Sequence, residues 1–262
     1  MARIPLYQLD AFTDRLFGGN PAAVMLLEAF PADAVLQALA AENNLAETAF
    51  LVREAEGWRL RWFTPRVEVP LCGHATLASA AVVLERLEPN LDQVVFQSAS
   101  GPLTVRRLGD GYELDFPARP SEAIAVPAAL AAALGAEPAE VWLNGFNYMA
   151  VFEDAAAVRA LRPDMAALAA LDRPGVIATA PGEDGYDMLS RYFAPAKGIP
   201  EDPVTGAAHC MLAPYWAARL GKSVLKGFQA SERGGEMTCR LEGDRVRLQG
   251  RCVFYLEGWV AL

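Results

Sequence analysis

The feature that most constrains this chain is an internal repeat. The string Arg61-Trp62-Phe63-Thr64-Pro65 returns as Arg191-Tyr192-Phe193-Ala194-Pro195, 130 residues later in a chain of 262. Each copy is followed by a glycine turn and a helix-like run, and the two glycines, Gly73 and Gly206, lie 133 residues apart. A string, a turn and a helix that recur in one order indicate duplication. The sequence therefore predicts two similar halves.

The secondary-structure pattern of both halves predicts an α+β protein. Strand-like runs surround a helix-like run at residues 75–87 in the first half and at residues 207–220 in the second. Tight turns, at Glu56-Gly57 and at Gly109-Asp110-Gly111, favour hairpins, so most neighbouring strands should be antiparallel. We interpret each half as strands wrapped around one long central helix.

The best linker is the stretch 118–125, which contains Arg119-Pro120-Ser121. It predicts an N-terminal half of residues 1–117 and a C-terminal half of residues 118–262. No Gly-x-Gly-x-x-Gly motif follows an early strand and no P-loop is present, so neither half is predicted to be a doubly wound nucleotide-binding fold.

Composition excludes several classes of function. A formal charge of −9 argues against nucleic acid, whose phosphates need a clustered basic surface. The N-terminus lacks the apolar core of a secretion signal, and the longest apolar run, around residues 75–84, is too short to span a bilayer. The four cysteines show no C-x-x-C spacing, which fits a reducing compartment. We therefore expect a cytoplasmic protein with no membrane or nucleic-acid partner.

The two helix starts predict a place for a small anion. In Leu71-Cys72-Gly73-His74-Ala75, the glycine lets the backbone turn sharply, and the first turn of the helix offers unpaired N–H groups and the positive end of its dipole. The second helix begins in the same way. We expect both starts to bind a carboxylate in a shared cleft, through the N–H groups of Gly73, His74, Gly206 and Ala207.

The chain contains only two histidines, His74 and His209, and each lies within three residues of a repeat glycine. His74 is in the first turn of its helix, where its ring can face a ligand, so we predict an acid/base or binding role for it. His209 lies further into its helix, beside Cys210, so packing is its default explanation. A zinc site is not favoured, because two histidines this far apart have no paired ligands nearby.

The remaining candidates for acid/base chemistry are one thiol and two carboxylates. Cys72 could form a nucleophile–base pair with His74, but residues two apart at a turn need not face each other, and a free cysteine is more often a buried hydrophobe. Asp202 lies near the second helix, where it can cap N–H groups or point into the cleft. Glu47 begins an otherwise apolar strand and, taken alone, is interpreted as a solvated strand end.

A set of motifs spread over nearly the whole chain resembles the phenazine-biosynthesis isomerase (PhzF-like) family. The motifs, in order, are Asp10-Ala11-Phe12-Thr13, Phe17-Gly18-Gly19-Asn20-Pro21-Ala22-Ala23-Val24, Glu47-Thr48-Ala49-Phe50, Arg61-Trp62-Phe63-Thr64-Pro65, Cys72-Gly73-His74-Ala75-Thr76 and Glu201-Asp202-Pro203-Val204-Thr205-Gly206. The resemblance implies the fold of diaminopimelate epimerase, with two pseudo-symmetric halves, each a mainly antiparallel sheet rolled around a central helix. This agrees with the duplication.

The resemblance also implies an activity. In the phenazine enzyme a glutamate moves a proton within a dihydro-hydroxyanthranilate ring, without a cofactor, and the protein is a homodimer. The matching glutamate here is Glu47, which becomes the first catalytic candidate. His74 and Asp202 match active-site positions of the family, and Asn20, in the second motif, is a further candidate for substrate binding.

Two departures from the family patterns limit what can be carried over. The serine that usually follows the second glycine is Ala207 here, which removes a hydroxyl from the site and puts the phenazine substrate in doubt. The epimerases of this fold use a cysteine on each side of the substrate. Cys72 fits the first of these positions, but Thr205 stands at the second, so two-thiol epimerisation is not expected.

These observations lead to one functional hypothesis with two alternatives. We predict a cofactor-independent and metal-independent isomerase, in which Glu47 moves a proton on a small carboxylated, possibly cyclic, metabolite while His74 and Asp202 orient it. The first alternative is a two-base epimerase or racemase of an amino-acid-like substrate. The second is a non-catalytic protein that binds a small anion, for which Ala207 is mild support.

Overall fold

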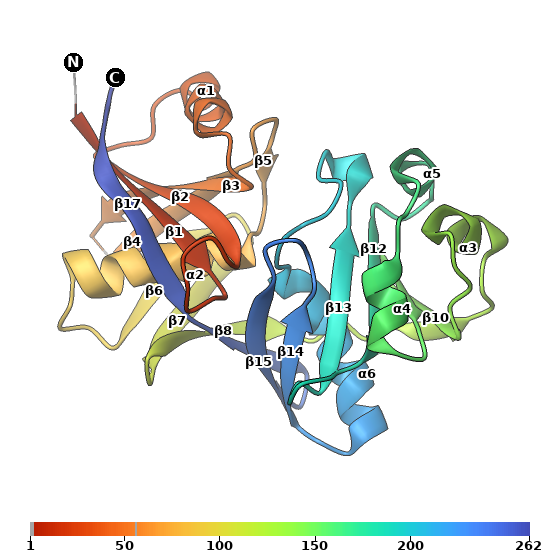
Figure 1. Cartoon of the computed structure of the whole chain (residues 1–262). Coiled ribbons are helices and arrows are strands. Elements are labelled where there is room, and N and C mark those ends of the chain that lie inside the picture. The colour runs from red at the N-terminus through yellow and green to blue at the C-terminus, as the bar shows by residue number, and fades with distance from the viewer. Residues whose placement is uncertain (1–2, 56) are drawn as a thin grey trace. The chain divides into compact units, whose positions relative to one another are not determined.

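A computed structural model describes residues 3–55 and 57–262 (Figure 1). The chain forms two compact units. Unit 1 consists of the residues up to Asp115 together with Leu248–Leu262, and unit 2 consists of Phe116–Arg247. Glu56, half of the first predicted hairpin turn, lies outside the described residues. None of the described helices combines the length and hydropathy needed to cross a bilayer.

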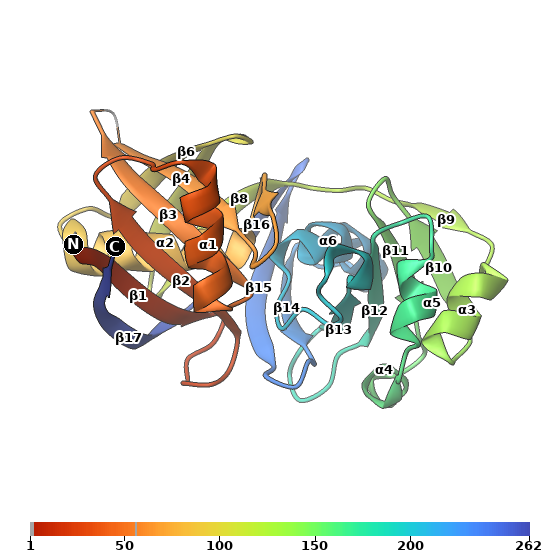
Figure 2. The ribbon, with the colours of Figure 1, turned by 90° about the horizontal axis from the view of Figure 1, so that it is seen from above.

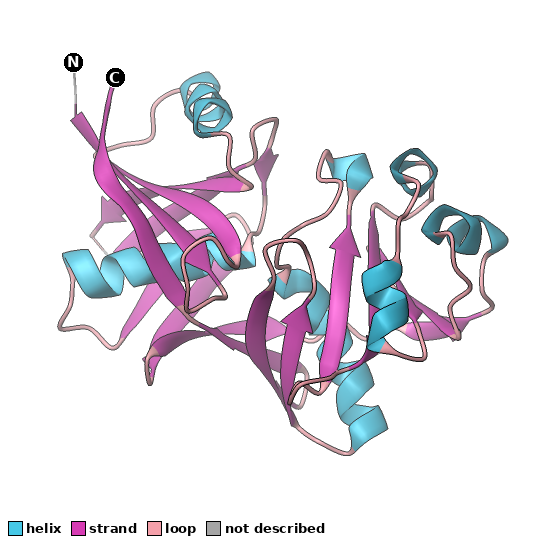
Figure 3. Ribbon diagram, in the orientation of Figure 1, coloured by secondary structure: helices cyan, strands magenta, loops and turns pink. Residues whose placement is uncertain are grey.

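Unit 1 is a sheet in which most neighbouring strands are antiparallel (Figure 3). Its strands are β1 (Arg3–Ala11), β2 (Asn20–Leu27), β3 (Glu47–Glu54), β4 (Gly57–Phe63), β5 (Glu68–Val69), β6 (Gln93–Ser98), β7 (Gly101–Leu108), β8 (Gly111–Pro117) and β17 (Cys252–Ala261). The pairs β2–β3 and β4–β6 are parallel. Parallel neighbours need a crossover connection, which helices α1 (Asp33–Asn43) and α2 (Gly73–Val82) supply.

Helix α1 covers part of the sheet of unit 1 (Figure 2). Its Leu36 and Leu39 join a buried cluster with Phe50 of β3 and Phe63 of β4. The two phenylalanine rings meet edge to face, with centroids 5.5 Å apart. This arrangement suits the quadrupoles of aromatic rings and packs neighbouring strands β3 and β4 together beneath the helix.

Helix α2 is the central helix of unit 1, because strands β1, β2, β3, β7 and β17 all pack against it. Every residue from His74 to Val82 is buried, as expected for a helix that is apolar or small on all sides. The hydroxyls of Thr76 and Ser79 donate to the carbonyl oxygens of Cys72 and Ala75, so their burial leaves no unpaired hydroxyl. The predicted run to Leu87 continues as a π-helical turn, Val83–Leu87, rather than as α-helix.

Strand β17 brings the end of the chain back to unit 1. It is antiparallel to β1 over the whole length of that strand, from Arg3 opposite Ala261 to Ala11 opposite Cys252. The units therefore differ from the predicted halves in two respects: residues 248–262 lie with the first half, not with the second, and unit 2 begins at Phe116 rather than at residue 118. This pairing joins residues about as distant in sequence as the chain allows, and no local pattern encodes it.

Unit 2 is built on the same plan. Its strands are β9 (Glu122–Ile124), β10 (Glu140–Leu143), β11 (Asn147–Val151), β12 (Gly175–Pro181), β13 (Met188–Phe193), β14 (Val224–Gln229), β15 (Gly235–Glu242) and β16 (Arg245–Gly250). Its helices are α3 (Ala128–Leu134), α4 (Ala155–Ala160), α5 (Met165–Ala169), the short 3₁₀ helix Pro195–Lys197 and α6 (Gly206–Leu220). Strand β14 was not predicted.

The pairing pattern confirms the duplication. In unit 1 the order is strand, helix, parallel strand, antiparallel strand, central helix, parallel strand (β2-α1-β3-β4-α2-β6). In unit 2 the same order runs β11-α4-α5-β12-β13-α6-β14. The repeated strings end β4 and β13, the strands that precede the two central helices.

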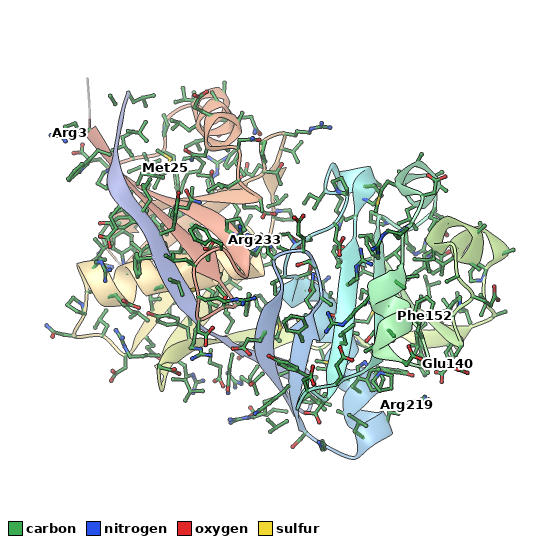
Figure 4. The ribbon with its side chains drawn as sticks, viewed as in Figure 1. Arg3, Met25, Glu140, Phe152, Arg219 and Arg233 are labelled. Atoms are coloured by element: carbon green, nitrogen blue, oxygen red, sulfur yellow. The ribbon has the colours of Figure 1, made fainter. Side chains whose placement is uncertain are left out.

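Helix α6 is the central helix of unit 2, where β14 and β15 pack against it. Most of its residues are buried, including Leu212 and Trp216. Near its C-terminus Arg219 donates to Glu140 of β10 over 2.8 Å, and both side chains are labelled in Figure 4. A cation near a helix C-terminus also suits the helix dipole.

The arginines of the repeat hold each unit together. Arg61 donates to both carboxylate oxygens of Glu68, over 2.8 and 2.7 Å. Arg191, buried in unit 2, makes the equivalent two-bond contact with Glu201, over 2.7 and 2.8 Å, and also donates to the carbonyl oxygen of Leu161. Paired guanidinium groups of this kind are structural, so the repeat marks the fold rather than a binding site.

Candidate active site

Glu47 is the first residue of β3, and its side chain is buried, with 8% of the residue exposed. It lies opposite Ala22 of the parallel strand β2, and the five residues after it are also buried. Glu47 therefore enters the interior with its strand. The interpretation of this residue, taken alone, as a solvated strand end was wrong. The catalytic role that the family resemblance implies for Glu47 stays a prediction.

The turn before α2 brings Cys72 and His74 to the same buried place. Cys72 is the N-cap residue in an extended conformation, Gly73 is the first helical residue, and His74 follows in the first turn. Cys72 is 7% exposed and His74 is 4% exposed. Cys72 Sγ lies 3.5 Å from His74 Nδ1 and accepts from the N–H of Ala75. The spacing left open whether these two side chains meet, and in the structure they do.

His74 lies between Cys72 and Glu47. Its other ring nitrogen, Nε2, is 3.1 Å from Glu47 Oε2. The two atoms are close enough for an ion pair, but their directions do not meet hydrogen-bond geometry, so neither has a well-aligned partner within residues 3–55 and 57–262. A buried polar atom in this state is costly. Between two groups that can exchange protons, such a contact can tighten when a ligand binds.

Electrostatics favours protons on both Cys72 and His74. Burial raises the pKa of the Cys72 thiol, and the charge of Glu47 raises it further. Burial alone would lower the pKa of His74, but its contacts with Cys72 and Glu47 outweigh this and hold that pKa well above its usual value. The cluster therefore retains hydrogen on the imidazole at neutral pH.

Glu47, Cys72 and His74 are also residue types that bind metal ions, and their ligand atoms all lie within 4.8 Å of one another. The thiol and the carboxylate, however, face opposite nitrogens of the imidazole ring. One ion can bind only one nitrogen of a given ring, so a metal would have to displace one of these two contacts. The observed arrangement fits a chain of proton donors and acceptors better than a metal centre.

Asn20, expected to bind substrate, lies close to Glu47 in the sheet. It is fully buried as the first residue of β2, and Ala22, two residues further along that strand, is in register with Glu47. Asn20 and Glu47 are thus the first residues of two neighbouring parallel strands, at the same end of the sheet of unit 1.

In unit 2, Asp202 is buried just before α6 and accepts from the hydroxyl of Thr205, the N-cap residue of that helix. Gln229, at the end of β14, completes the network: its Nε2 donates to Asp202 O over 2.7 Å, and its Oε1 accepts from Thr205 N over 2.9 Å. Gln229 is 1% exposed and was missed, because its strand was missed. The available signal was Gln229 itself, a polar residue at the end of a strand that follows the predicted second central helix.

The start of α6 lies directly after this network. Gly206 is buried and begins the helix, and Ala207, half-buried, is the next residue. Both helices thus begin at the repeat glycines as predicted, and the use of their N–H groups to hold a ligand in one cleft stays a prediction.

His209 has a structural environment. It is 1% exposed, and its Nδ1 lies 2.9 Å from the carbonyl oxygen of Thr205, which can only accept. Nδ1 therefore carries the hydrogen. A Cβ on Gly227 would come within 2.9 Å of Met188 Cε and 3.3 Å of His209 Nε2, so the glycine leaves room for both side chains. Burial lowers the pKa of His209 to about 4, so the ring is neutral at physiological pH and acts as packing.

Comparison with known proteins identifies the relatives of this fold and site. The profile of the phenazine biosynthesis-like protein family (PhzC-PhzF) matches residues 9–258. An uncharacterized isomerase of Pseudomonas aeruginosa is 50% identical over 260 residues, which cover 99% of both chains. The crystal structure of a PhzF-family phenazine biosynthesis protein from Enterococcus faecalis covers 100% of both chains, with a TM-score of 0.96 and 44% identity.

A more distant structure shares the fold alone. A probable proline racemase from Agrobacterium radiobacter is 14% identical and covers 99% of this chain and 93% of its own, with a TM-score of 0.64. The fold is therefore that of the epimerase and racemase group, as predicted. With half of its residues identical to a protein named an isomerase, the chain belongs to the phenazine biosynthesis-like protein family and is an isomerase.

Proposed function

We propose that this isomerase uses Glu47, without a cofactor, to move a proton between two carbons of a small carboxylated molecule. The observation that carries the proposal is the buried Glu47 carboxylate, 3.1 Å from His74 Nε2 and without a well-aligned partner in the described chain. A carboxylate of this kind has an unused acceptor in a site shielded from water. That is the requirement for a general base that must return the same proton.

The chemical step balances within the substrate and Glu47. The carboxylate removes a proton from a carbon next to an electron-withdrawing group, and the C–H electron pair delocalises into the conjugated system. Glu47 then returns the proton to a second carbon on the same face. Nothing is oxidised or reduced, and the enzyme ends in its starting state. General acid–base help of this kind contributes about 10²–10⁴ in rate.

The other site residues bind and orient. The N–H groups at the starts of α2 and α6, from Gly73, His74, Gly206 and Ala207, would hold the substrate carboxylate or the developing enolate. His74 would donate to Glu47 or to the substrate, and Asp202 and Asn20 would hydrogen-bond its polar groups. Because Ala207 offers no hydroxyl, the preferred substrate should not require one at that position.

The rival function is a two-base epimerase or racemase, and one observation bears on it. The Cys72 thiol lies beside His74 in the same buried cluster as Glu47, so a proton donor and a proton acceptor of unlike type are both present. A two-base enzyme inverts one stereocentre and brings in a solvent hydrogen there, whereas the proposed isomerase moves a hydrogen from one carbon to another.

A panel of substrates tests the proposal. Cyclic dienoic amino acids of the dihydro-hydroxyanthranilate type and simple amino acids would each be incubated with the enzyme in heavy water and followed by proton NMR. We expect migration of a double bond in the cyclic acids. Deuterium entering only at the α-carbon of an amino acid, with inversion, would instead establish the rival function.

A matched pair of variants then assigns the base. Glu113 of unit 1 is also a buried glutamate, 6% exposed, but it accepts from Gln249 Nε2 over 2.8 Å and lies 3.5 Å from Arg106 Nε. Glu47→Gln should abolish double-bond migration, while Glu113→Gln should retain it. Equal activity of the two variants would contradict the assignment of Glu47.

The remaining parts of the proposal come from the family resemblance. We propose that the protein works in the cytoplasm, in a biosynthetic process, as a homodimer. Sedimentation equilibrium of the purified chain tests the last point, because a dimer has twice the 28.2 kDa mass of one chain.

A further inference from the structure

The two nitrogens of the His74 ring face two groups of different hydrogen-bonding capacity. Nδ1 lies 3.5 Å from the Cys72 thiol, which can donate its hydrogen. Nε2 lies 3.1 Å from Glu47 Oε2, and an ionised carboxylate can only accept. The ring is therefore not symmetric in its surroundings, and which nitrogen carries hydrogen is decided by its neighbours.

We propose that Cys72 is a positioning residue that keeps a hydrogen on His74 Nε2, so that His74 acts toward Glu47 only as a donor. The thiol is fixed for this task, since it accepts from the N–H of Ala75 and is 7% exposed. Its own hydrogen then points to Nδ1. With Nδ1 accepting from the thiol, the hydrogen of a neutral ring resides on Nε2.

The same conclusion holds if the ring is charged. Contacts with Cys72 and Glu47 hold the pKa of His74 well above its usual value, although burial opposes this. An imidazolium carries hydrogen on both nitrogens, so Nε2 again faces Glu47 as a donor. Neither state leaves Nε2 able to accept a proton.

The consequence for catalysis rests on the proposed function. A proton that Glu47 takes from the substrate cannot pass to His74, because Nε2 is already occupied. It must return to the substrate. Without the thiol, and once Glu47 carries the proton, the hydrogen of a neutral ring can move to Nδ1; Nε2 then becomes an acceptor, and the substrate proton gains a route to solvent. Cys72 thus limits the loss of the migrating proton without touching the substrate.

The histidine content of the chain makes the test direct. Only His74 and His209 are present, so the full-length protein labelled with ¹⁵N at histidine shows two imidazole spin systems. His209→Asn removes one of them and assigns the other. His209 is also an internal reference, because its Nδ1 donates to the Thr205 carbonyl and should show the opposite tautomer.

Three proteins complete the experiment, and each carries Glu47→Gln, whose neutral amide stands in for protonated Glu47: one with Cys72 intact, one with Cys72→Ala and one with the conservative Cys72→Ser. We expect hydrogen on Nε2 of His74 at neutral pH with Cys72 intact, its loss from Nε2 in Cys72→Ala, and its return in Cys72→Ser, whose hydroxyl can donate to Nδ1. An unchanged His74 spectrum in Cys72→Ala overturns the inference. A bare Nε2 in the protein with Cys72 intact also overturns it, even if the other variants fail to fold.

This readout does not depend on turnover, so the two proposals fail separately. Hydrogen on Nε2 with an active Glu47→Gln variant would leave the tautomer assignment standing and remove the proposed base. A bare Nε2 with an inactive Glu47→Gln variant would do the reverse.

Discussion

The two central helices begin in the same repeated motif, yet they hold their histidines in opposite chemical states. In unit 1, His74 directly follows the glycine and lies between a thiol and a carboxylate, which raise its pKa. In unit 2, His209 lies three residues after Gly206 and donates to a backbone carbonyl, and burial lowers its pKa to about 4. A shift of two positions along a helix turns a potential acid/base group into packing.

The candidate carboxylates of the two units, Glu47 and Asp202, also differ in their surroundings. Glu47 Oε2 has no well-aligned partner among the described residues, whereas the carboxylate of Asp202 accepts from the Thr205 hydroxyl within a network that Gln229 completes. An unsatisfied carboxylate is ready to take a proton, while one that accepts a hydrogen bond is better suited to hold a substrate in place. The two units share one plan, and only the carboxylate of unit 1 has the surroundings of a base.

The largest effect should come from removing the charge of the Glu47 and Asp202 carboxylates. Glu47→Gln is expected to lower kcat about 10²–10⁴-fold, since the general base is lost. Asp202→Asn should act mainly on KM, because that residue orients the substrate. Steady-state kinetics on the substrate found in the panel measures both. If Asp202→Asn lost more kcat than Glu47→Gln, the roles of the two units would have to be exchanged.

Matched leucines in the two central helices should give the next largest effect. Leu77 of α2 and Leu212 of α6 are both fully buried. Replacing either by alanine leaves a cavity and should lower the free energy of unfolding by about 2–5 kcal/mol. Denaturant unfolding measures this. A loss below about 1 kcal/mol in one variant only would show that its helix is not the core of its unit.

His209 predicts a loss of stability in acid. Its pKa is about 4 in the folded protein and 6.5 as the ordinary value, so between these values the unfolded chain binds more protons. The free energy of unfolding should therefore fall as the pH drops through this range, by about 3 kcal/mol over the whole interval. His209→Asn keeps a donor for the Thr205 carbonyl but cannot titrate.

Denaturant unfolding of the wild type and His209→Asn, at neutral pH and at the acid end of this range, checks that prediction. The difference between the two proteins should shrink or reverse in acid. Parallel pH dependence in both proteins would mean that His209 is not the group responsible. His74 predicts the opposite sign, since a raised pKa gives stability that is lost as the pH rises through the folded value.

The smallest effect concerns Ala207. Ala207→Ser restores the hydroxyl usual in the family at a half-buried position in the first turn of α6. Stability should change by less than about 0.5 kcal/mol. Activity on a dihydro-hydroxyanthranilate substrate, compared with the wild type, is the informative measurement. A gain would show that Ala207 sets substrate choice, and equal rates would show that the hydroxyl is irrelevant there.

The sequence predicted those parts of the molecule that depend on local pattern. The repeated strings, the glycine turns and the apolar helix runs placed both central helices, and hairpin turns such as Gly109-Asp110-Gly111 gave the antiparallel neighbours. The pairing of β17 with β1 could not be predicted, because it joins the two ends of the chain. Strand β14 was missed because Lys226 and Gly227 interrupt its apolar pattern.

The sequence supplied candidate residues for the site but not their contacts. Family resemblance identified Glu47, although its position at a strand end gave no local sign of burial. The meeting of Cys72 and His74 depends on how the first turn of α2 orients two side chains, which spacing alone does not determine. Only the folded chain shows that one imidazole separates the thiol from the carboxylate.

In the proposed mechanism a single carboxylate, Glu47, both removes and returns the migrating proton. The most direct measurement uses substrate deuterated at the carbon that loses its hydrogen, with the product analysed by mass spectrometry after one turnover in ordinary water. We predict that a large part of the deuterium reappears at the new carbon in the wild type. Complete replacement by solvent hydrogen in the wild type would contradict transfer by one base.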